Sequence, residues 1–285
     1  MKIAVCETKS GTGNFLTERL VNEGFDIAFI SREDIECGVQ YLKQLLFDID
    51  IVINLCGNEI IRKWTSSRKE RIYNSHVRNT RLLVKTINGL ERKPSLFITL
   101  TLVNIYDNVE IHDEFSQNFA TDFLGDFCRN WEQEVCKINS EVRYCIFRSG
   151  FVLDKNKVYF QNLLKYFKWG FGKKIGDGKQ PFPFIHIKDV ENIILWSIKN
   201  NKTEGIYNMV APEVITNAEF YATFSKVLKR RALFKISKKM INTQLGEASE
   251  IFTKGKFVLP HRLLSSGYEF IYPTLKEGLD DIFKE

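Results

Sequence analysis

Short apolar runs rich in β-branched residues alternate with stretches of helical periodicity through the first 150 residues, and this constrains the fold most strongly. The apolar runs are Lys2–Cys6, Asp26–Ile30, Ile49–Leu55, Ser95–Leu100 and Arg143–Phe147. Strands that alternate with helices form right-handed βαβ units and hence a doubly wound parallel sheet. We therefore predict an α/β fold whose central sheet has the spatial order third, second, first, fourth and fifth run.

Local signals support the individual elements. Gly13 opens a helical stripe that ends at Gly24, a residue type favoured at helix C-termini. Ser67, followed three residues later by Glu70, predicts a capping box for a long helix that stops before Pro94. The run Ile49–Leu55 has almost no polar alternation, which is typical of a strand covered on both faces.

The pattern changes after Gly150, and this change predicts a second lobe. Residues 151–183 are rich in aromatic residues and lysines, and the chain from Pro212 is helical and broken by loops. Residues 184–210 return to a strand-and-helix pattern, with Gly205–Val210 as a last strand of the main sheet. We predict a Rossmann-type dinucleotide-binding domain from 1–150 plus 184–210, and a smaller substrate-binding lobe from 151–183 and 211–285. Ligands of such sheets bind outside the carboxyl ends of the strands, so we expect the cleft between sheet and lobe.

Composition argues against several other classes of protein. The 285 residues carry a net charge of only +6, and the lysines and arginines are scattered among acids, so we expect no nucleic-acid partner. No apolar run is long enough for a membrane span or a signal peptide. The six cysteines have no regular spacing, which argues against disulfides and a metal site. We expect a reduced, cytoplasmic protein.

The loop after the first run is the expected pyrophosphate site. A Rossmann protein holds this group with glycines and the N-terminus of the following helix. The expected contacts are Ser10, Gly11, Thr12, Gly13, Asn14 and Phe15. Of the glycine positions 7, 10 and 13 only Gly13 is filled, and Glu7 brings a carboxylate toward the diphosphate. We therefore expect this loop to bind the cofactor weakly or not at all. The alternative interpretation is that the loop is a βα turn that binds no ligand.

Arg32 follows the second run, where an acidic residue binds the ribose hydroxyls in NAD-dependent proteins. An arginine there suits the 2′-phosphate of NADP, so we expect NADP rather than NAD. Glu33 and Asp34 beside it leave open the alternative of a solvated loop arginine.

Longer motifs carry a resemblance to a known family. The segment NLCGNEIIRKWTSSRKERIYNSHVRNTRLLV and the later segments FRSGFVLDKN, GDGKQPFPFIHIKDV, NMVAPEVITNAEF and FVLPHRLLSSGYEFIYPTLKEGL carry it. Together they resemble, over essentially the whole chain, the epimerase-like branch of the extended short-chain dehydrogenases/reductases.

The resemblance implies site residues. Asn54, Cys56 and Gly57 stand where the family chain passes the adenine side of the cofactor, although a plain strand-terminating turn explains Gly57 almost as well. Arg148 stands near the nicotinamide end, where it is expected to contact the cofactor or a substrate anion. His186 stands at a strand-to-helix junction, where we expect a backbone hydrogen bond rather than catalysis.

The wider superfamily uses a Ser/Thr–Tyr–Lys set, in which the Tyr is the general acid/base. Alignment on Trp131 and Glu132 puts Leu124 and Cys128 at the Tyr and Lys positions, so this pair is missing. The hydroxyl position falls on Thr101, and Tyr106 is a candidate substitute acid, although a packing role explains that tyrosine as well.

Two functions remain open. The first is an NADP-dependent oxidoreductase or epimerase that acts on a small molecule such as a sugar nucleotide or another anionic metabolite. The second is a non-catalytic nucleotide-binding or interaction protein on a degenerate Rossmann scaffold, which the missing Tyr-Lys pair and the depleted glycine loop favour.

Overall fold

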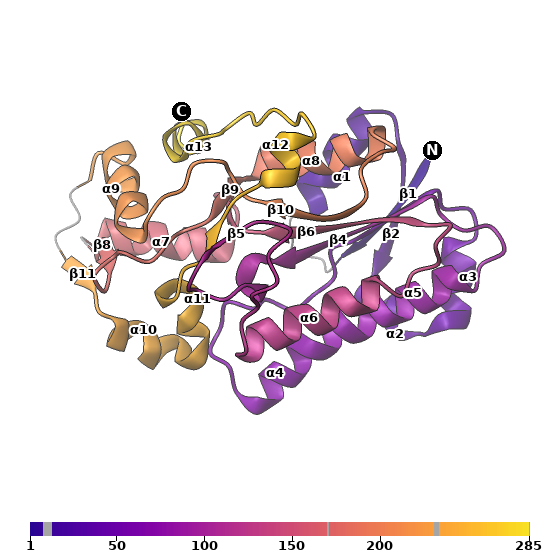
Figure 1. The fold of residues 1–285 in the computed structure, drawn as a ribbon, viewed down its shortest axis with the longest axis horizontal. Coiled ribbons are helices and arrows are strands. Elements are labelled where there is room, and N and C mark those ends of the chain that lie inside the picture. Colours follow the sequence, from indigo (N-terminus) through magenta and orange to yellow (C-terminus); the bar gives the residue numbers. More distant parts are fainter. Residues whose placement is uncertain (8–12, 170, 231–233, 285) are drawn as a thin grey trace.

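The computed structural model describes residues 1–7, 13–169, 171–230 and 234–284, and Figure 1 shows their arrangement. In this part of the chain a parallel sheet of six strands forms the centre of the molecule. Its spatial order is β2 (Asp26–Ser31), β1 (Lys2–Glu7), β3 (Ile51–Asn54), β4 (Leu96–Leu102), β6 (Arg143–Ser149) and β10 (Gly205–Met209). The predicted doubly wound parallel sheet is confirmed.

The predicted strand order is wrong in one respect. β3 does not lie outside β2 but between β1 and β4, with which it pairs residue by residue. Burial explains this placement, because all four β3 residues are buried whereas Asp26 and Phe29 of β2 are exposed. A continuously apolar strand buries the most apolar surface in the interior of a sheet, where both of its faces are covered. A strand with exposed positions suits an edge.

Helices cover both faces of the sheet (Figure 1). One face carries α1 (Gly13–Asn22), α8 (Ile187–Lys199) and α12 (His261–Ser265). The other carries α2 (Arg32–Glu36), α3 (Val39–Leu46), α5 (Asn79–Asn88) and α6 (Phe123–Val135). The chain leaves β1 on the first face and β3 on the second, so the strand order reverses between these two strands. In open α/β sheets such a switch point, at the carboxyl ends of the strands, is where ligands bind.

The long helix predicted before Pro94 is built from three pieces. α4 (Ser66–Tyr73) passes through a short π-helical segment (Asn74–Arg78) into α5. The predicted cap at Ser67 is wrong, because the Thr65 hydroxyl accepts the Arg68 backbone N–H and the helix begins at Ser66. Trp64 lies buried directly before this cap and fixes where the chain enters the helix.

Apolar layers lie on both faces of the sheet. Ile3, Ile53, Ile98 and Phe147 face α1 and α8, and their neighbours Ala4, Val52, Phe97 and Ile146 face α3 and α5. The alternation along each strand thus places successive residues in two separate cores, both fully buried, as a doubly covered sheet requires.

The remaining elements gather beside the carboxyl ends of the strands, at one end of the molecule (Figure 1). They are α7 (Val158–Lys168), α9 (Asn217–Val227), α10 (Lys238–Leu245), α11 (Glu250–Thr253), α13 (Leu275–Ile282) and three strand pairs. The pairs are β8 (Phe171–Ile175) with β11 (Phe234–Ile236), β7 (Phe151–Leu153) with β9 (Phe184–His186), and β5 (Ile111–His112) with β12 (Phe257–Val258). An aromatic core that includes Phe160, Phe167, Phe220 and Phe224 holds this region together.

All six cysteines are free thiols in the structure. Among the described residues, no group of His, Cys, Asp and Glu could hold a metal ion. The described helices include none with the length and apolar character that crossing a membrane requires.

Candidate functional site

The α6 face of the sheet changes from apolar to polar toward the carboxyl ends of the strands. Phe97 and Ile146 are followed two residues later by Thr99 and Arg148, and Thr101 follows Thr99. Thr101 is the register partner of Arg148, which is the register partner of Asn208. Parallel register places these three side chains side by side on one face, and all three are buried.

Arg148 is paired within the protein. Its Nε donates to Glu132 Oε1 at 2.9 Å, its Nη2 donates to Glu132 Oε2 at 2.7 Å, and its Nη1 donates to the Tyr106 hydroxyl at 2.6 Å. Burial opposes the charge of the guanidinium, but the bonds to Glu132 outweigh burial and raise the pKa of Arg148. Thr101 donates to the same carboxylate at 2.9 Å. The structure thus brings the predicted Thr101, Tyr106 and Arg148 together around Glu132.

Tyr106 is fully buried below the carboxyl ends of the strands. Besides the Arg148 contact, its hydroxyl lies 2.9 Å from the Asp113 carbonyl oxygen and 2.9 Å from Asn208 Oδ1, so one proton is shared between two acceptors. Burial raises the pKa of Tyr106 to about 12, although Arg148 opposes this rise. The phenol is therefore neutral and enclosed at neutral pH.

The same network reaches the C-terminal motifs. Asn208 Nδ2 donates to the Leu259 carbonyl at 3.0 Å, and the Asn208 backbone N–H donates to Glu114 at 2.8 Å. Glu114 also accepts the Arg262 backbone N–H at 3.2 Å. Burial raises the pKa of the Glu114 carboxyl. Three of the segments that carry the family resemblance, those that contain Arg148, Asn208 and Arg262, therefore meet in one buried hydrogen-bond network.

The residues after β3 are held by a second set of contacts. Asn54 Nδ2 and Trp131 Nε1 both donate to the Thr80 hydroxyl at 2.9 Å. The Cys56 backbone N–H donates to Asn54 Oδ1 at 3.2 Å, and the Cys56 side chain is buried in the α3/α5 core.

Gly57 is required by a close approach of His76. A Cβ atom built on Gly57 would lie 1.9 Å from His76 Nε2, so a larger residue would displace the imidazole ring. His76 is buried, its Nδ1 lies 2.8 Å from the Ile72 carbonyl, and burial lowers the pKa of His76 to about 4. The predicted close approach exists, and the imidazole makes it.

The inner face of α6 carries apolar side chains at the positions of the missing pair. Leu124 and Cys128 are buried beside Phe127 and Trp131. Burial raises the pKa of the Cys128 thiol, with the Glu132 carboxylate adding to the rise. Neither side chain can donate a proton to a ligand from this position.

Arg32 opens α2 at the end of β2. Its Nε pairs with Glu36 at 2.8 Å, and its Nη1 donates to Asn58 Oδ1 at 3.1 Å. Arg71 and Arg78, both exposed, share with Arg32 a cavity of about 300 Å³. The other residues that line it are Glu36, Asn74, Asn79 and Leu82.

The predicted pyrophosphate loop lies largely outside the described residues. This applies to Ser10, Gly11 and Thr12, and to the side chains of Glu7, Asn14 and Phe15. The structure does place the end of β1 at Glu7 and the start of α1 at Gly13. The N-terminus of α1 therefore follows the end of β1 at the switch point of the sheet.

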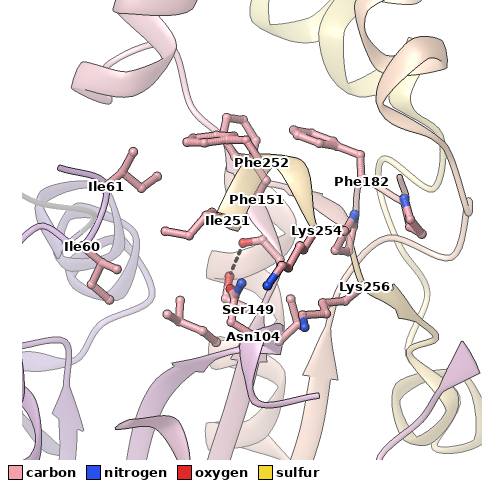
Figure 2. Close-up of a pocket in the computed structure, with 16 residues that line it drawn as sticks. Ile60, Ile61, Asn104, Ser149, Phe151, Phe182, Ile251, Phe252, Lys254 and Lys256 are labelled. Carbon is pink, nitrogen blue, oxygen red and sulfur yellow. Dashed lines mark hydrogen bonds between the residues drawn. The ribbon is translucent and has the colours of Figure 1, made fainter. Parts of the chain in front are cut away.

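Two adjoining cavities lie between the sheet and the lobe. The smaller, of about 110 Å³, is lined by residues after β4 and β6 and by the segment 251–256 (Figure 2). In Figure 2, Ile60 and Ile61 lie on one side of it and Lys254 and Lys256 on the other. The larger, of about 240 Å³, is lined mainly by α7, α9 and α10 and also by Glu59 and Ile61. Four residues line both cavities, namely Ile61, Phe151, Phe182 and Phe252.

The structural role expected for His186 is confirmed. Its Nδ1 accepts the Lys188 backbone N–H at 3.2 Å and caps α8. Burial lowers the pKa of His186 to about 4. The first turn of α8 carries Asp189, which accepts the backbone N–H groups of Ile271 and Tyr272 and joins α8 to the C-terminal motif.

Sequence reasoning missed several residues of these sites. Arg71 and Arg78 lie seven positions apart in helical segments, a spacing that places both on one face, and this signal was available. Glu132 lies four residues after Cys128 on the apolar stripe of α6, and a charge on such a stripe indicates a buried partner. Lys256 gave no periodic signal, because it lies in a short segment between α11 and β12.

Comparison with known proteins gives a consistent set of relatives. A family model described as "Domain of unknown function (DUF1731)" matches residues 237–282. Over 237 residues the chain is 31% identical to the chloroplastic homologue of epimerase family protein SDR39U1 from Arabidopsis thaliana, covering 82% of this chain and 68% of that protein. It is 29% identical over 301 residues to epimerase family protein YfhF of Bacillus subtilis, covering 100% and 99% of the two chains. The crystal structure of human epimerase family protein SDR39U1 (isoform 2) with NADPH matches with a TM-score of 0.91 at 28% identity, covering 99% of each chain.

Proposed function

Because the chain belongs to the epimerase family of SDR39U1-like proteins, within the extended short-chain dehydrogenases/reductases, we propose that it binds NADP(H) and acts as an oxidoreductase or epimerase on a small molecule. The observation that carries the cofactor assignment is the cavity shared by Arg32, Arg71 and Arg78. The human relative was crystallised with NADPH, which agrees with this choice.

The arginine cavity suits a phosphate in charge and position. It lies at the end of β2, where the ribose of a dinucleotide binds in Rossmann proteins. Three arginines line it, and Glu36 is the only acid among the described residues that line it. Arginine recognises phosphate with paired hydrogen bonds, which a ribose hydroxyl cannot fully replace.

Asn79 supplies a further polar group. It lines the arginine cavity, and its buried Nδ2 finds no hydrogen-bond partner within the described residues. A buried donor without a partner is costly, so a ligand oxygen that accepts from it would stabilise both. We assign the adenosine 2′-phosphate end of NADP(H) to this cavity.

The rest of the cofactor would follow the carboxyl ends of the strands. In this proposal the loop after β1 and the N-terminus of α1 hold the pyrophosphate with Ser10, Gly11, Thr12, Gly13, Asn14 and Phe15. Asn54, Cys56 and Gly57 form the floor beside the adenosine. When bound, the nicotinamide would supply or accept hydride. Thr101, Tyr106 and Arg148 lie beneath that end, where we assign them a positioning role.

The lobe completes the substrate site in this proposal. We propose that residues 1–150 and 184–210 form the cofactor domain and that 151–183 and 211–285 form the substrate-binding lobe. The two cavities between them support this division, since both combine lining residues from the two parts.

Replacement of Arg32 by Ala tests the cofactor assignment. We expect it to weaken NADPH binding by about 1–3 kcal/mol, the range for a charge-assisted hydrogen bond, and to change NADH binding little. Fluorescence titration of both cofactors at fixed ionic strength measures this. Arg19→Ala is the matched control, because Arg19 lies on the opposite face of the sheet in α1 and pairs with Glu23. Equal loss for NADPH and NADH would refute a 2′-phosphate contact.

A second function is favoured by one observation, the absence of a tyrosine and a lysine at the two matching positions of α6. Leu124 and Cys128 fill the positions of the Tyr-Lys pair, and Tyr106 is enclosed. A protein that binds NADP(H) without catalysis would keep the arginine cavity and show no loss of NADPH absorbance with any carbonyl substrate. Dependence of NADPH oxidation on an added carbonyl compound would exclude it.

A further inference from the structure

The larger cavity of the lobe is lined almost wholly by apolar and aromatic side chains. Its walls come from α7, α9 and α10, and its members include Leu163, Phe220, Tyr221 and Ile241. The Tyr166 hydroxyl donates to Gln244 Oε1 at 3.2 Å and joins α7 to α10 across it. The non-aromatic polar residues of the lining, Glu59, Asn162 and Gln244, are all exposed.

This lining has no cation for a diphosphate. No lysine or arginine occurs among the described residues that line the larger cavity. A sugar nucleotide carries two phosphates that need arginines, lysines or free backbone N–H groups in a closed site. An apolar wall instead gains free energy from burying apolar surface of a ligand.

The smaller cavity provides a single buried charge. Lys256 is only 5% exposed and lines this cavity together with Asn104 and Ser149. It makes neither an ion pair nor a side-chain hydrogen bond with any described residue, whereas the neighbouring Lys254 pairs with Glu250 at 2.9 Å. A largely buried lysine that forms no ion pair is costly, and a carboxylate ligand would reduce that cost.

The backbone holds Lys256 in this place. A Cβ atom on Gly255 would lie 1.9 Å from the Pro181 carbonyl oxygen, so the chain between Lys254 and Lys256 lies directly against the Pro181 backbone. β12 begins at Phe257 and pairs with β5, which fixes the other side of Lys256. Burial lowers the pKa of Lys256, while Asp122, Asp107 and Glu250 oppose this change and Lys254 adds to it.

We infer that the two joined cavities bind one elongated, mostly apolar carboxylic acid, with its carboxylate on Lys256 and its apolar part in the lobe. This inference rests on the proposed function, because the carboxylate end would lie beside the carboxyl ends of β4 and β6, next to the nicotinamide end of the cofactor. Of the two substrate classes that the sequence left open, the inference favours an anionic metabolite, here an apolar carboxylic acid, over a sugar nucleotide.

Calorimetric titration with octanoate, octanol and UDP-glucose tests the ligand class in the presence of NADPH. We expect octanoate to bind, octanol to bind more weakly and UDP-glucose to bind weakest of the three. Lys256→Met should weaken octanoate binding about tenfold and leave octanol binding unchanged, because only the carboxylate needs the ammonium. Lys256→Arg should restore most of the loss. Lys202→Met, on the exposed surface at the other end of β10, is the control and should change nothing.

A second pair of variants tests the apolar part. Leu163→Glu places a charge in the lobe cavity and should abolish binding of both octanoate and octanol. Lys165→Glu, exposed on the same helix and outside the cavity, should leave both unchanged. Thermal unfolding of each variant shows whether it is folded.

The outcomes separate the two proposals. Tight UDP-glucose binding, or octanoate binding that is indifferent to Lys256→Met and Leu163→Glu, would overturn the apolar-acid site. Octanoate binding by a protein that does not bind NADPH would leave the site standing and refute the cofactor assignment.

Discussion

Two arginine-containing regions lie at the carboxyl end of the same sheet, and they differ in how far their guanidinium groups are satisfied. Arg148 is 3% exposed and makes three hydrogen bonds, two to Glu132 and one to Tyr106. Arg32, Arg71 and Arg78 line an open cavity, and among the described residues Arg32 bonds to the exposed Glu36 and the half-buried Asn58. A guanidinium whose donors are used inside the protein supports the fold, whereas one that faces a cavity can bind an anion.

The difference between these two regions also shows how far a family motif predicts the contacts of a residue. The sequence predicts ligand contacts for both arginines, for Arg32 from its place after the second strand and for Arg148 from the family resemblance. Its motifs do not reveal that Glu132, on a helix 16 residues before Arg148, occupies the guanidinium. Long motifs such as NMVAP and VLPHR here join the sheet to the C-terminal segment through Asn208 and Leu259.

The largest expected effect is on stability, from Arg148→Met. Removing one partner of a buried ion pair leaves the Glu132 carboxylate uncompensated, which costs about 3–5 kcal/mol. Urea unfolding should show this loss, and the double variant with Glu132→Leu should recover much of it because both charges are then gone. If Arg148→Met left stability unchanged but abolished NADPH binding, the guanidinium would be a ligand group and the contrast between the two regions would fail.

A smaller effect is expected from acid, through the buried His76, whose ring packs against Phe127 and Trp131 of α6. Burial holds the folded-state pKa of His76 at about 4, below the value of about 6.5 in an unfolded chain. The unfolded state therefore binds the proton first, so stability is lost as pH falls from about 6.5 to about 4, by roughly 3 kcal/mol in all.

His76→Phe isolates this contribution. Unfolding free energies measured between pH 7 and pH 4 should fall less steeply in the variant, whatever its stability at pH 7. His186, whose pKa is also about 4, remains in both proteins and contributes equally. Parallel pH profiles for the two proteins would show that His76 is not kept neutral in the fold.

Some features of the fold followed from the sequence and others did not. The alternation of strands and helices was predictable because periodicity determines it, and the family resemblance implied the backbone hydrogen bond of His186. The order of the strands in the sheet could not be predicted in the same way, because the strands that pair lie far apart in sequence. The signal for the interior position of β3 was nevertheless present in its unbroken apolar run, against the Asp26 that begins β2. The site was only partly predictable, because Lys256 and the arginines reach their cavities through tertiary packing.

The smallest effect expected is on cofactor affinity, from Glu7→Gly at the end of β1. Glu7 is the register partner of Ser31 at the end of β2, so its backbone lies at the switch-point edge where the pyrophosphate would bind. One like-charge pair about 5 Å apart costs roughly 3 kcal/mol at an effective dielectric constant of about 20. Solvent, the charge of Lys9 two residues along the chain and the positive end of α1 reduce this cost. We therefore expect Glu7→Gly to tighten NADPH binding about tenfold, which corresponds to 1.4 kcal/mol.

Glu7→Gln separates the effect of the charge from the effect of the bulk, because it removes the charge and keeps a side chain of the same size. Fluorescence titration should place Glu7→Gln close to Glu7→Gly if charge dominates, and close to the unmodified protein if bulk does. NADPH affinity that is the same in all three proteins would mean that the loop after β1 tolerates an acid, and that the arginine cavity alone sets the strength of binding.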